Sequence, residues 1–189
     1  MKLIVAITGA SGMIYPLHLL KFLKSKKVET YLIISEPAKK IIEYELEINP
    51  IDLIKIASKN YEIDDLSSPI SSGSQTFDAM VIIPCSMNTA AAIANGYSDN
   101  LIRRVADVAL KEGRKLIIVP RETPMNAIHL ENLLKLARLN VAIVPACPAF
   151  YHKPKNIEQI VDFFTGRVLM QLNIKNDLYK PWTGDLSQF

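Results

Sequence analysis

The sequence predicts a doubly wound α/β protein, in which parallel strands alternate with helices along the chain. Three observations support this fold class. Short runs rich in valine and isoleucine recur along the 189 residues, as in strands that are covered on both faces. The segments between them carry apolar residues at helical spacing. Loops rich in glycine and hydroxyl residues follow the apolar runs, at the strand ends where such sheets bind ligands.

Five strands are expected in one parallel sheet with right-handed crossovers. Each is a short, almost wholly apolar run. The predicted strands are Leu3–Ile7, Thr30–Ser35, Ala79–Pro84, Lys115–Pro120 and Val141–Pro145.

Six helices are expected between and after these strands. The first is marked by Ile14, Leu17 and Leu20, and the last leads into a polar tail at about residues 174–189. The polar stretch Ser67–Thr76 is expected to form a mobile loop that contributes nothing to the core. The other predicted helices are Ala38–Leu46, Asn88–Asn95, Leu101–Ala109, Ile128–Leu136 and Val161–Leu172.

Composition indicates one globular domain, residues 1–189, because 49% hydrophobic content in a chain of this length can bury one good core. The net charge of +3 is small and its lysines and arginines are scattered, which argues against nucleic-acid binding. Two cysteines and three histidines without ligand spacing predict neither a disulfide framework nor a metal site. The N-terminus lacks a signal-peptide pattern, so we expect a cytoplasmic protein.

One uncharged stretch, Ala79–Tyr97, is long enough to suggest a membrane span. Proline, glycine, asparagine and hydroxyl residues interrupt it. We therefore expect a strand followed by a separate helix, and no span of a membrane.

The loops after the predicted strands hold the candidate functional residues. They read "GASG", "PCSMNT", "PRETP" and "PACPAFYHKP", and Ser35 follows the second strand. Taken singly, each has an ordinary explanation: a tight turn, a surface ion pair, or a tyrosine that only packs. Because the carboxyl ends of parallel strands share one edge, their joint placement favours a functional site.

A dinucleotide site fits the first loop poorly. From Gly9, the third glycine of that fingerprint would fall near Tyr15 or Pro16. The pair Tyr151 and Lys155 has the spacing of short-chain dehydrogenases, but an intervening proline would break the required helical turn. Two glycines and a serine instead fit the phosphate of a mononucleotide at a helix N-terminus.

Several segments resemble the UbiX-type flavin prenyltransferases, which are flavoproteins related to the cysteine decarboxylases. The segments are "GASGMIY", "IIS", "PCSMNTAAAIANGYSDNLIRRVADVALKEGRKLIIVPRETP", "IHLENLLKLA" and "PAFYHKP". The resemblance covers nearly the whole chain. It implies a flavodoxin-like Rossmann fold, a homododecamer, and FMN bound between subunits.

The activity that this resemblance implies is transfer of a dimethylallyl group from dimethylallyl monophosphate to reduced FMN, without a metal. The product, prenylated FMN, would serve a UbiD-type decarboxylase, as in ubiquinone-type decarboxylation.

Matching positions assign the site residues. Those implied for FMN are Gly9, Ala10, Ser11, Ser35, Ser86, Met87, Asn88, Thr89 and Arg121. Those implied for the prenyl phosphate are Arg104, Lys111, Arg121, Glu122, Tyr151 and Arg167. Those implied for catalysis are Ser11, Glu45, Lys111 and Glu122. Cations and a phenol suit a phosphate leaving group, and seven-residue spacing puts Arg104 and Lys111 on one helix face.

Two departures and three alternatives accompany this interpretation. Pro16 stands where the family usually has glycine, which the first turn of a helix tolerates, and residues 49–74 match poorly. One alternative is an FMN-dependent cysteine decarboxylase of the phosphopantothenoylcysteine type. Such enzymes use a histidine in the region of the first helix, and His18 lies nearby but in no matching context. The others are a flavin carrier without catalysis and an aromatic-acid decarboxylase, for which no pocket is apparent.

Overall fold

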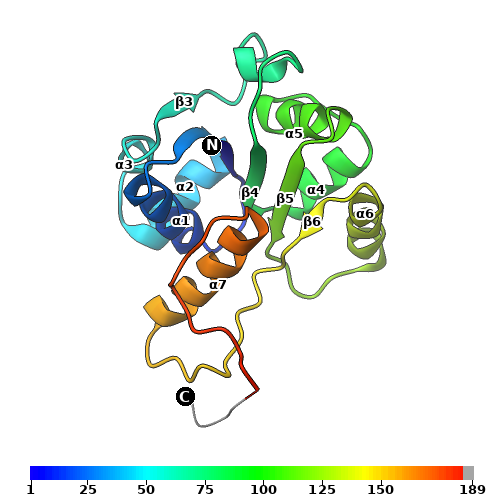
Figure 1. The fold of residues 1–189 in the computed structure, drawn as a ribbon. Coiled ribbons are helices and arrows are strands. Elements are labelled where there is room, and N and C mark those ends of the chain that lie inside the picture. Colours follow the sequence, from blue (N-terminus) through cyan, green and yellow to red (C-terminus); the bar gives the residue numbers. More distant parts are fainter. Residues whose placement is uncertain (185–189) are drawn as a thin grey trace.

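Six parallel strands form one sheet in the computed structural model, which describes residues 1–184 (Figure 1). The strands lie in the order β3-β2-β1-β4-β5-β6. Every neighbouring pair is parallel. Their bounds are β1 Lys2–Ile7, β2 Glu29–Ile34, β3 Lys59–Tyr61, β4 Ala79–Cys85, β5 Lys115–Pro120 and β6 Ala142–Ile143.

The five predicted strands are confirmed, and a sixth was missed. Without β3, the remaining strands follow the flavodoxin order 2-1-3-4-5; with it, the order is 3-2-1-4-5-6. β3 has only three residues and includes the polar Lys59 and Asn60 at the edge of the sheet, so it lacks the apolar run that marked the others. Strand order reverses between β1 and β4, where open α/β sheets bind ligands.

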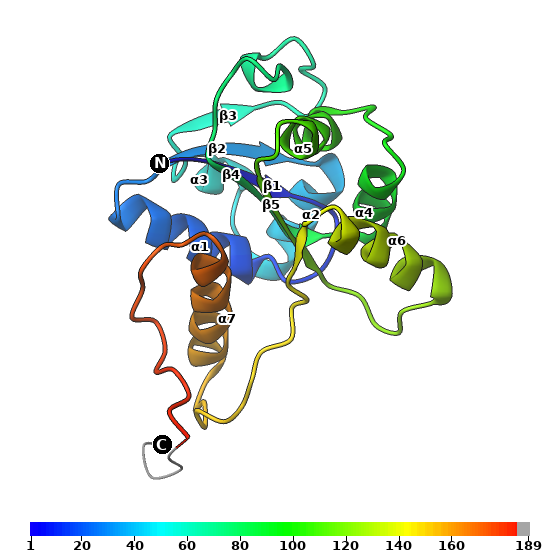
Figure 2. The same cartoon turned by 45° about the vertical axis from the view of Figure 1, so that its right-hand side comes forward.

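Helices cover both faces of the sheet (Figures 1 and 2). One layer contains α1 Ile14–Ser25, α2 Glu36–Leu46, α3 Pro50–Ile54 and α7 Ile157–Gln171. The opposite layer contains α4 Met87–Ala94, α5 Leu101–Lys111 and α6 Ala127–Arg138. The six predicted helices are confirmed, the short α3 is additional, and Pro16 lies in the first turn of α1 as expected.

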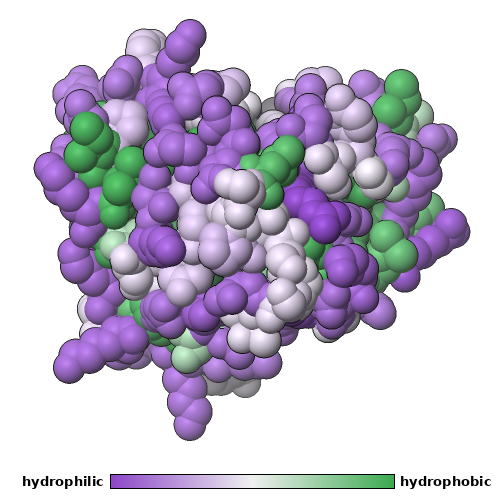
Figure 3. Space-filling model, turned by 90° about the horizontal axis from the view of Figure 1, so that it is seen from above, coloured by the Kyte–Doolittle hydropathy of each residue, from purple (hydrophilic) through white to green (hydrophobic). Residues whose placement is uncertain are grey.

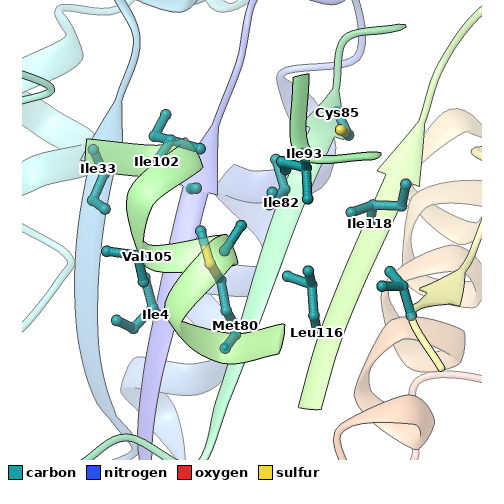
Figure 4. Packing of buried hydrophobic residues seen from close by; sticks show 14 of the residues in the cluster. Ile4, Ile33, Met80, Ile82, Cys85, Ile93, Ile102, Val105, Leu116 and Ile118 are labelled. Carbon is teal, nitrogen blue, oxygen red and sulfur yellow. The ribbon is translucent and has the colours of Figure 1, made fainter. Parts of the chain in front are cut away.

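The core on the α4–α5 side is a layer of aliphatic side chains between sheet and helices (Figure 4). Ile4, Ile82 and Ile118 of the sheet are fully buried there, as is Val105 of α5. Each such side chain contributes about 1.5–3 kcal/mol through burial. Burial also raises the pKa of the Cys85 thiol to about 12, so this cysteine packs as a neutral side chain.

The segment Ser67–Thr76 packs against the rest of the protein and contributes one residue to the core. Ile70, in the 3-10 turn Pro69–Ser71, is fully buried. Arg104 Nε donates to the Ser71 carbonyl at 3.0 Å, and Arg114 donates to the Gly73 carbonyl at 2.6 Å. The prediction that this stretch adds nothing to the core is therefore wrong. Figure 3 looks down on this end of the molecule, which is largely hydrophilic with separate hydrophobic spots.

Residues 79–97 divide into β4 and α4, as the sequence predicted. Within residues 1–184, no helix has the length and apolar character needed to cross a membrane. The predicted tail begins after α7, and Tyr179 in it donates to Met170 Sδ at 2.6 Å. Its last five residues, 185–189, lie outside the described part of the chain.

Candidate active site

A cavity of about 360 Å³ opens where β1, β2 and β4 end, and we call it the hydroxyl pocket. Three helices begin around it, because its lining includes the N-cap residues of α2, α4 and α5: Ser35, Ser86 and Asn100. Helix N-termini favour anions through free N–H groups and the helix dipole. The full lining is Thr8, Gly9, Ser35, Pro37, Ile63, Ser86, Asn88, Thr89, Asn100, Ile102 and Arg103.

The hydroxyls of this pocket retain protons that an anion can use. Ser35 Oγ accepts the Ala38 N–H, which leaves its own O–H as a donor. Ser86 Oγ accepts the Thr89 N–H and donates to Thr89 Oγ1 at 3.0 Å, so the Thr89 hydroxyl can donate onward. The arrangement fits a phosphate group.

Thr8 has a different task. It donates to the Pro84 carbonyl at 2.9 Å and accepts the Ser86 N–H at 2.8 Å, which joins the ends of β1 and β4. Gly9 is required by close packing, since a Cβ there would lie 2.7 Å from Pro37 Cβ. The loop "GASG" therefore lies directly against the start of α2.

Beside this pocket, the N-terminus of α1 is occupied by a carboxylate. Glu45 Oε2 accepts the Met13 N–H at 2.7 Å and the Gly12 N–H at 2.9 Å. The expectation that a phosphate binds at this helix start is therefore corrected. The hydroxyl pocket, with three helix N-termini around it, is the alternative place for a phosphate.

The environment of Glu45 keeps it ionised. Burial alone would raise its pKa, but the Ser11 hydrogen bond, the Met13 and Gly12 N–H groups and the Arg121 charge together lower the pKa. Ser11, Glu45 and Arg121 thus come together from the first loop, α2 and the end of β5, as expected for three of the predicted site residues.

A second cavity, of about 610 Å³, lies between the chain after β6 and helix α7, and we call it the aromatic cavity. Two predicted phosphate-binding residues, Tyr151 and Arg167, line it. Tyr151 contacts the Phe163 and Trp182 rings, each with its centroid 5.6 Å away. The full lining is Ala142, Ile143, Val144, Pro145, Cys147, Ala149, Tyr151, Phe163, Phe164, Arg167 and Gln171.

Tyrosines of this region remain neutral hydrogen-bond donors. Burial, with a smaller effect of Tyr179, raises the pKa of Tyr151, and Arg167 opposes this only in part. Burial and nearby Cys147 raise the pKa of Tyr15. The Tyr15 and Phe164 ring centroids are 4.7 Å apart. Because Phe164 lines the aromatic cavity, this contact connects the start of α1 to that cavity.

The remaining predicted residues lie elsewhere in the single chain. Arg104 and Lys111 share one face of α5, as their spacing predicted, but neither lines the aromatic cavity. Arg104 pairs with Asp107 at 2.9 Å and Lys111 with Glu112 at 2.7 Å. Glu122 is half-buried after β5 and accepts the N–H of its neighbour Thr123.

Two residues predicted to contact the flavin have buried side chains. Met87 and Ala10 are both buried, and the Met87 side chain belongs to the core, so flavin contacts there would come from the backbone.

Sequence reasoning missed Asn100 and Arg103, both of which line the hydroxyl pocket. Asn100 could have been found, because asparagine just before an apolar helical pattern is a typical N-cap. Arg103 carries no such signal, since its neighbour Arg104 has the same chemistry and faces another way.

An open parallel sheet with a pocket for an anion at its switch point is typical of nucleotide-binding α/β proteins. The sequence profile of the Flavoprotein family matches residues 1–169, and the chain belongs to this family.

Within this family, the chain is similar to flavin prenyltransferases. The chain is 58% identical over 182 residues to the flavin prenyltransferase UbiX of Methanocaldococcus jannaschii, covering 96% of this chain and 98% of the relative. Its fold matches the crystal structure of AnUbiX (PadA1) in complex with FMN and dimethylallyl pyrophosphate. That match has a TM-score of 0.95 and 41% identity, and covers 97% of both chains.

A dodecameric FMN-dependent UbiX-like decarboxylase from Escherichia coli O157:H7 also matches, with a TM-score of 0.95 and 46% identity. It covers 97% of this chain and 100% of that one.

Proposed function

We propose that this protein is a flavin prenyltransferase that joins a dimethylallyl group from dimethylallyl monophosphate to reduced FMN. One observation carries the proposal: the hydroxyl pocket and the aromatic cavity both adjoin the segment that runs from Gly9 to Tyr15. One cavity suits the phosphate of FMN. The other offers a guanidinium and a phenol for a second phosphate, within apolar walls for a prenyl chain. The 58% identity to a flavin prenyltransferase supports the proposed activity.

The hydroxyl pocket would hold the FMN phosphate through the Ser35 and Thr89 hydroxyls and the N-termini of three helices. Reduced FMN, when bound, supplies the nucleophilic ring atoms of the reaction. Gly9 allows the loop to lie close to α2, and Arg121 with Ser11 lies at the neighbouring Glu45 carboxylate.

The aromatic cavity would bind the prenyl phosphate. Arg167 and the neutral Tyr151 hydroxyl can each donate hydrogen bonds to phosphate oxygens. Breaking the allylic C–O bond leaves negative charge on the phosphate and builds positive charge on the prenyl carbons. The guanidinium stabilises the former, and the faces of aromatic rings such as Phe163 attract the latter.

Proton handling falls to carboxylates at the strand ends. Glu45 is ionised and hydrogen-bonded to Ser11, so it can accept a proton through that hydroxyl. Glu122, at the end of β5, is the second candidate for moving a proton during ring closure.

A second copy of the chain would complete the site. Arg104 and Lys111 lie on α5 away from the aromatic cavity, so their predicted role requires a cavity of a neighbouring subunit. Ile128, Leu130 and Leu134 of α6 are at least half exposed, which suits burial between copies. The similar Escherichia coli protein is dodecameric, and we propose the same state here. The product would pass to a UbiD-type decarboxylase in the cytoplasm.

The cysteine decarboxylase alternative is not favoured by the position of His18. This histidine lies between α1 and α7, with Nδ1 3.5 Å from Asp162. It lines neither of the two cavities.

The test is anaerobic incubation of the protein with reduced FMN and dimethylallyl monophosphate, followed by mass spectrometry of the extracted flavin. The expected result is a flavin heavier by one dimethylallyl group. A parallel reaction with the pyrophosphate reveals which donor is preferred. An unchanged flavin, with FMN bound and the protein folded, would refute the proposal.

A further inference from the structure

Arg103 is the one charged side chain among the residues that line the hydroxyl pocket. It lies on α5, three residues after the N-cap Asn100, and its side chain is only 14% exposed. A phosphate dianion placed in this pocket would therefore meet hydroxyls, helix N-termini and a single guanidinium. The location gives Arg103 a direct electrostatic effect on any anion bound there.

The guanidinium is held in place from three sides. Its Nη1 donates to Asp99 Oδ1 at 2.7 Å in an ion pair, and its Nη2 donates to Asn88 Oδ1 at 2.6 Å. It also lies over the Tyr97 ring, 5.7 Å from the centroid. A side chain fixed in this way loses little freedom when an anion binds. The Asp99 carboxylate offsets part of the Arg103 charge, but Asp99 is the more exposed partner, so water screens it more than it screens the guanidinium.

The contact with Asn88 also fixes the orientation of that amide. A guanidinium has donors and no acceptor, so the amide atom that faces it must be the oxygen. The Asn88 NH₂ group is then directed away from Arg103. Asn88 itself lines the pocket, so an NH₂ fixed in this way is a candidate further donor to a bound anion.

One buried donor of Arg103, Nε, has no hydrogen-bond partner within residues 1–184. Buried donors are normally satisfied, and an unsatisfied one lowers stability. An anion beside the guanidinium would supply the missing acceptor after a small adjustment of the side chain.

We infer that Arg103 makes the hydroxyl pocket selective for a phosphorylated flavin, by supplying its positive charge and by orienting Asn88. The inference rests on the proposed function, in that the pocket receives the phosphate end of FMN. It adds a selectivity determinant for FMN over riboflavin, which has the same ring and ribityl chain but no phosphate.

The experiment is fluorescence titration of flavin-free protein with FMN and with riboflavin, for the parent and for Arg103→Gln. The variant should bind FMN about ten- to a hundredfold more weakly, as expected for loss of a charge-assisted phosphate contact, and riboflavin nearly as the parent does. Arg103→Lys keeps the charge but not the planar fork, and should lie between the two. Lys21→Gln removes a positive charge from the exposed face of α1 and should change neither affinity.

Several outcomes overturn the inference. If Arg103→Gln keeps the parent ratio of FMN to riboflavin affinity, Arg103 does not determine selectivity. If both affinities fall equally together with the melting temperature, Arg103 is only a structural link between α4 and α5. Should Arg103→Gln fail to fold, Arg103→Lys decides, and an unchanged ratio there also refutes the inference. A parent protein that binds no FMN refutes the proposed function itself, which separates the two failures.

Discussion

Glu45 caps the N-terminus of α1 through a hydrogen bond of 2.7 Å from the Met13 N–H to Oε2. The carboxylate comes from the last turns of α2, so the contact joins two helices across the first loop. It occupies the place where a nucleotide phosphate would otherwise bind, and it brings a negative charge close to Ser11 and Arg121. Under the proposed function, this one residue would leave the hydroxyl pocket as the place for the phosphate and would serve as a proton acceptor beside the loop.

Replacing Glu45 with Gln should destabilise the fold in a pH-dependent way. The folded state lowers the pKa of Glu45 below its unfolded value of about 4.3. The ionised carboxylate therefore stabilises the protein above that pH, and this contribution is lost as the pH falls through the folded pKa. Urea unfolding should show a loss of about 1 kcal/mol at pH 7, typical of a charge at a helix N-terminus. The loss should shrink below about pH 4.

The matched control for this prediction is Glu43→Gln, an exposed glutamate on the same helix that should change stability little at either pH. An equal loss for Glu45→Gln at pH 7 and at pH 3.5 would show that the carboxylate charge does not matter.

Cys147 should report on occupancy of the aromatic cavity. Its thiol is exposed and lines the cavity with Arg167, whereas the Cys85 thiol is buried with a pKa of about 12. Iodoacetamide should therefore modify Cys147 and spare Cys85, as read by peptide mass spectrometry. Dimethylallyl monophosphate at ten times its dissociation constant should slow the modification about tenfold.

Arg167→Gln should abolish most of this protection at the same ligand concentration, because phosphate binding is weakened. Modification of the parent at an unchanged rate with ligand present would place the prenyl phosphate outside this cavity.

Most of the fold could be predicted because buried parallel strands leave a simple pattern. The runs at Leu3–Ile7 and Lys115–Pro120 are apolar on both faces, and each is followed by a helical pattern. β3 could not be found in this way, since two of the three residues in this edge strand are polar. Ile70 was missed for a related reason: one apolar residue in a polar stretch gives no periodicity, and its burial depends on arginines from α5 and beyond.

The site was partly predictable for the same reason. Ser35, Ser86 and Thr89 follow strands directly, so the topology brings them together whatever the details of packing. The hydrogen bonds of Glu45 to Gly12 and Met13 depend on how α2 packs against the first loop, which spacing alone does not give. The separation of Arg104 and Lys111 from Tyr151 could not be foreseen. Their spacing shows that the two residues share a face of a helix, but it does not show which part of the protein that face contacts.

Glu122 and Arg167 should differ in the kinetic constant that they control. Arg167→Gln should raise KM for the prenyl phosphate about ten- to a hundredfold through loss of a charge-assisted contact, with FMN affinity unchanged. Glu122→Gln should leave KM near the parent value and lower kcat on the order of a hundredfold, through loss of a proton-transferring carboxylate. Steady-state kinetics with flavin mass spectrometry separates the two. Equal effects on kcat and KM in both variants would contradict this division of roles.

Inactive variants of two residues should restore activity to each other when their subunits are mixed. At a prenyl phosphate concentration near the parent KM, Lys111→Ala and Arg167→Ala should each have little activity alone. Lys111 lies on α5 beside Glu112, and Arg167 lines the aromatic cavity, so a site containing both takes them from different copies of the chain. In a mixed oligomer, some sites then combine the intact Arg167 of one variant with the intact Lys111 of the other. Random mixing of equal amounts leaves about a quarter of the sites with both residues intact in a closed symmetric oligomer.

The measurement is to unfold the two variants together, refold the mixture, and assay prenylated flavin against each variant refolded alone. Recovery toward about a quarter of parent activity is expected, with light scattering confirming that the mixture forms the same large oligomer. A mixture of Tyr151→Ala with Arg167→Ala is the matched control, because both residues line the same cavity of one chain and no mixed site is intact. If the Lys111 and Arg167 variants recover no more activity than this control, the two residues act within a single subunit or Lys111 has no part in the site.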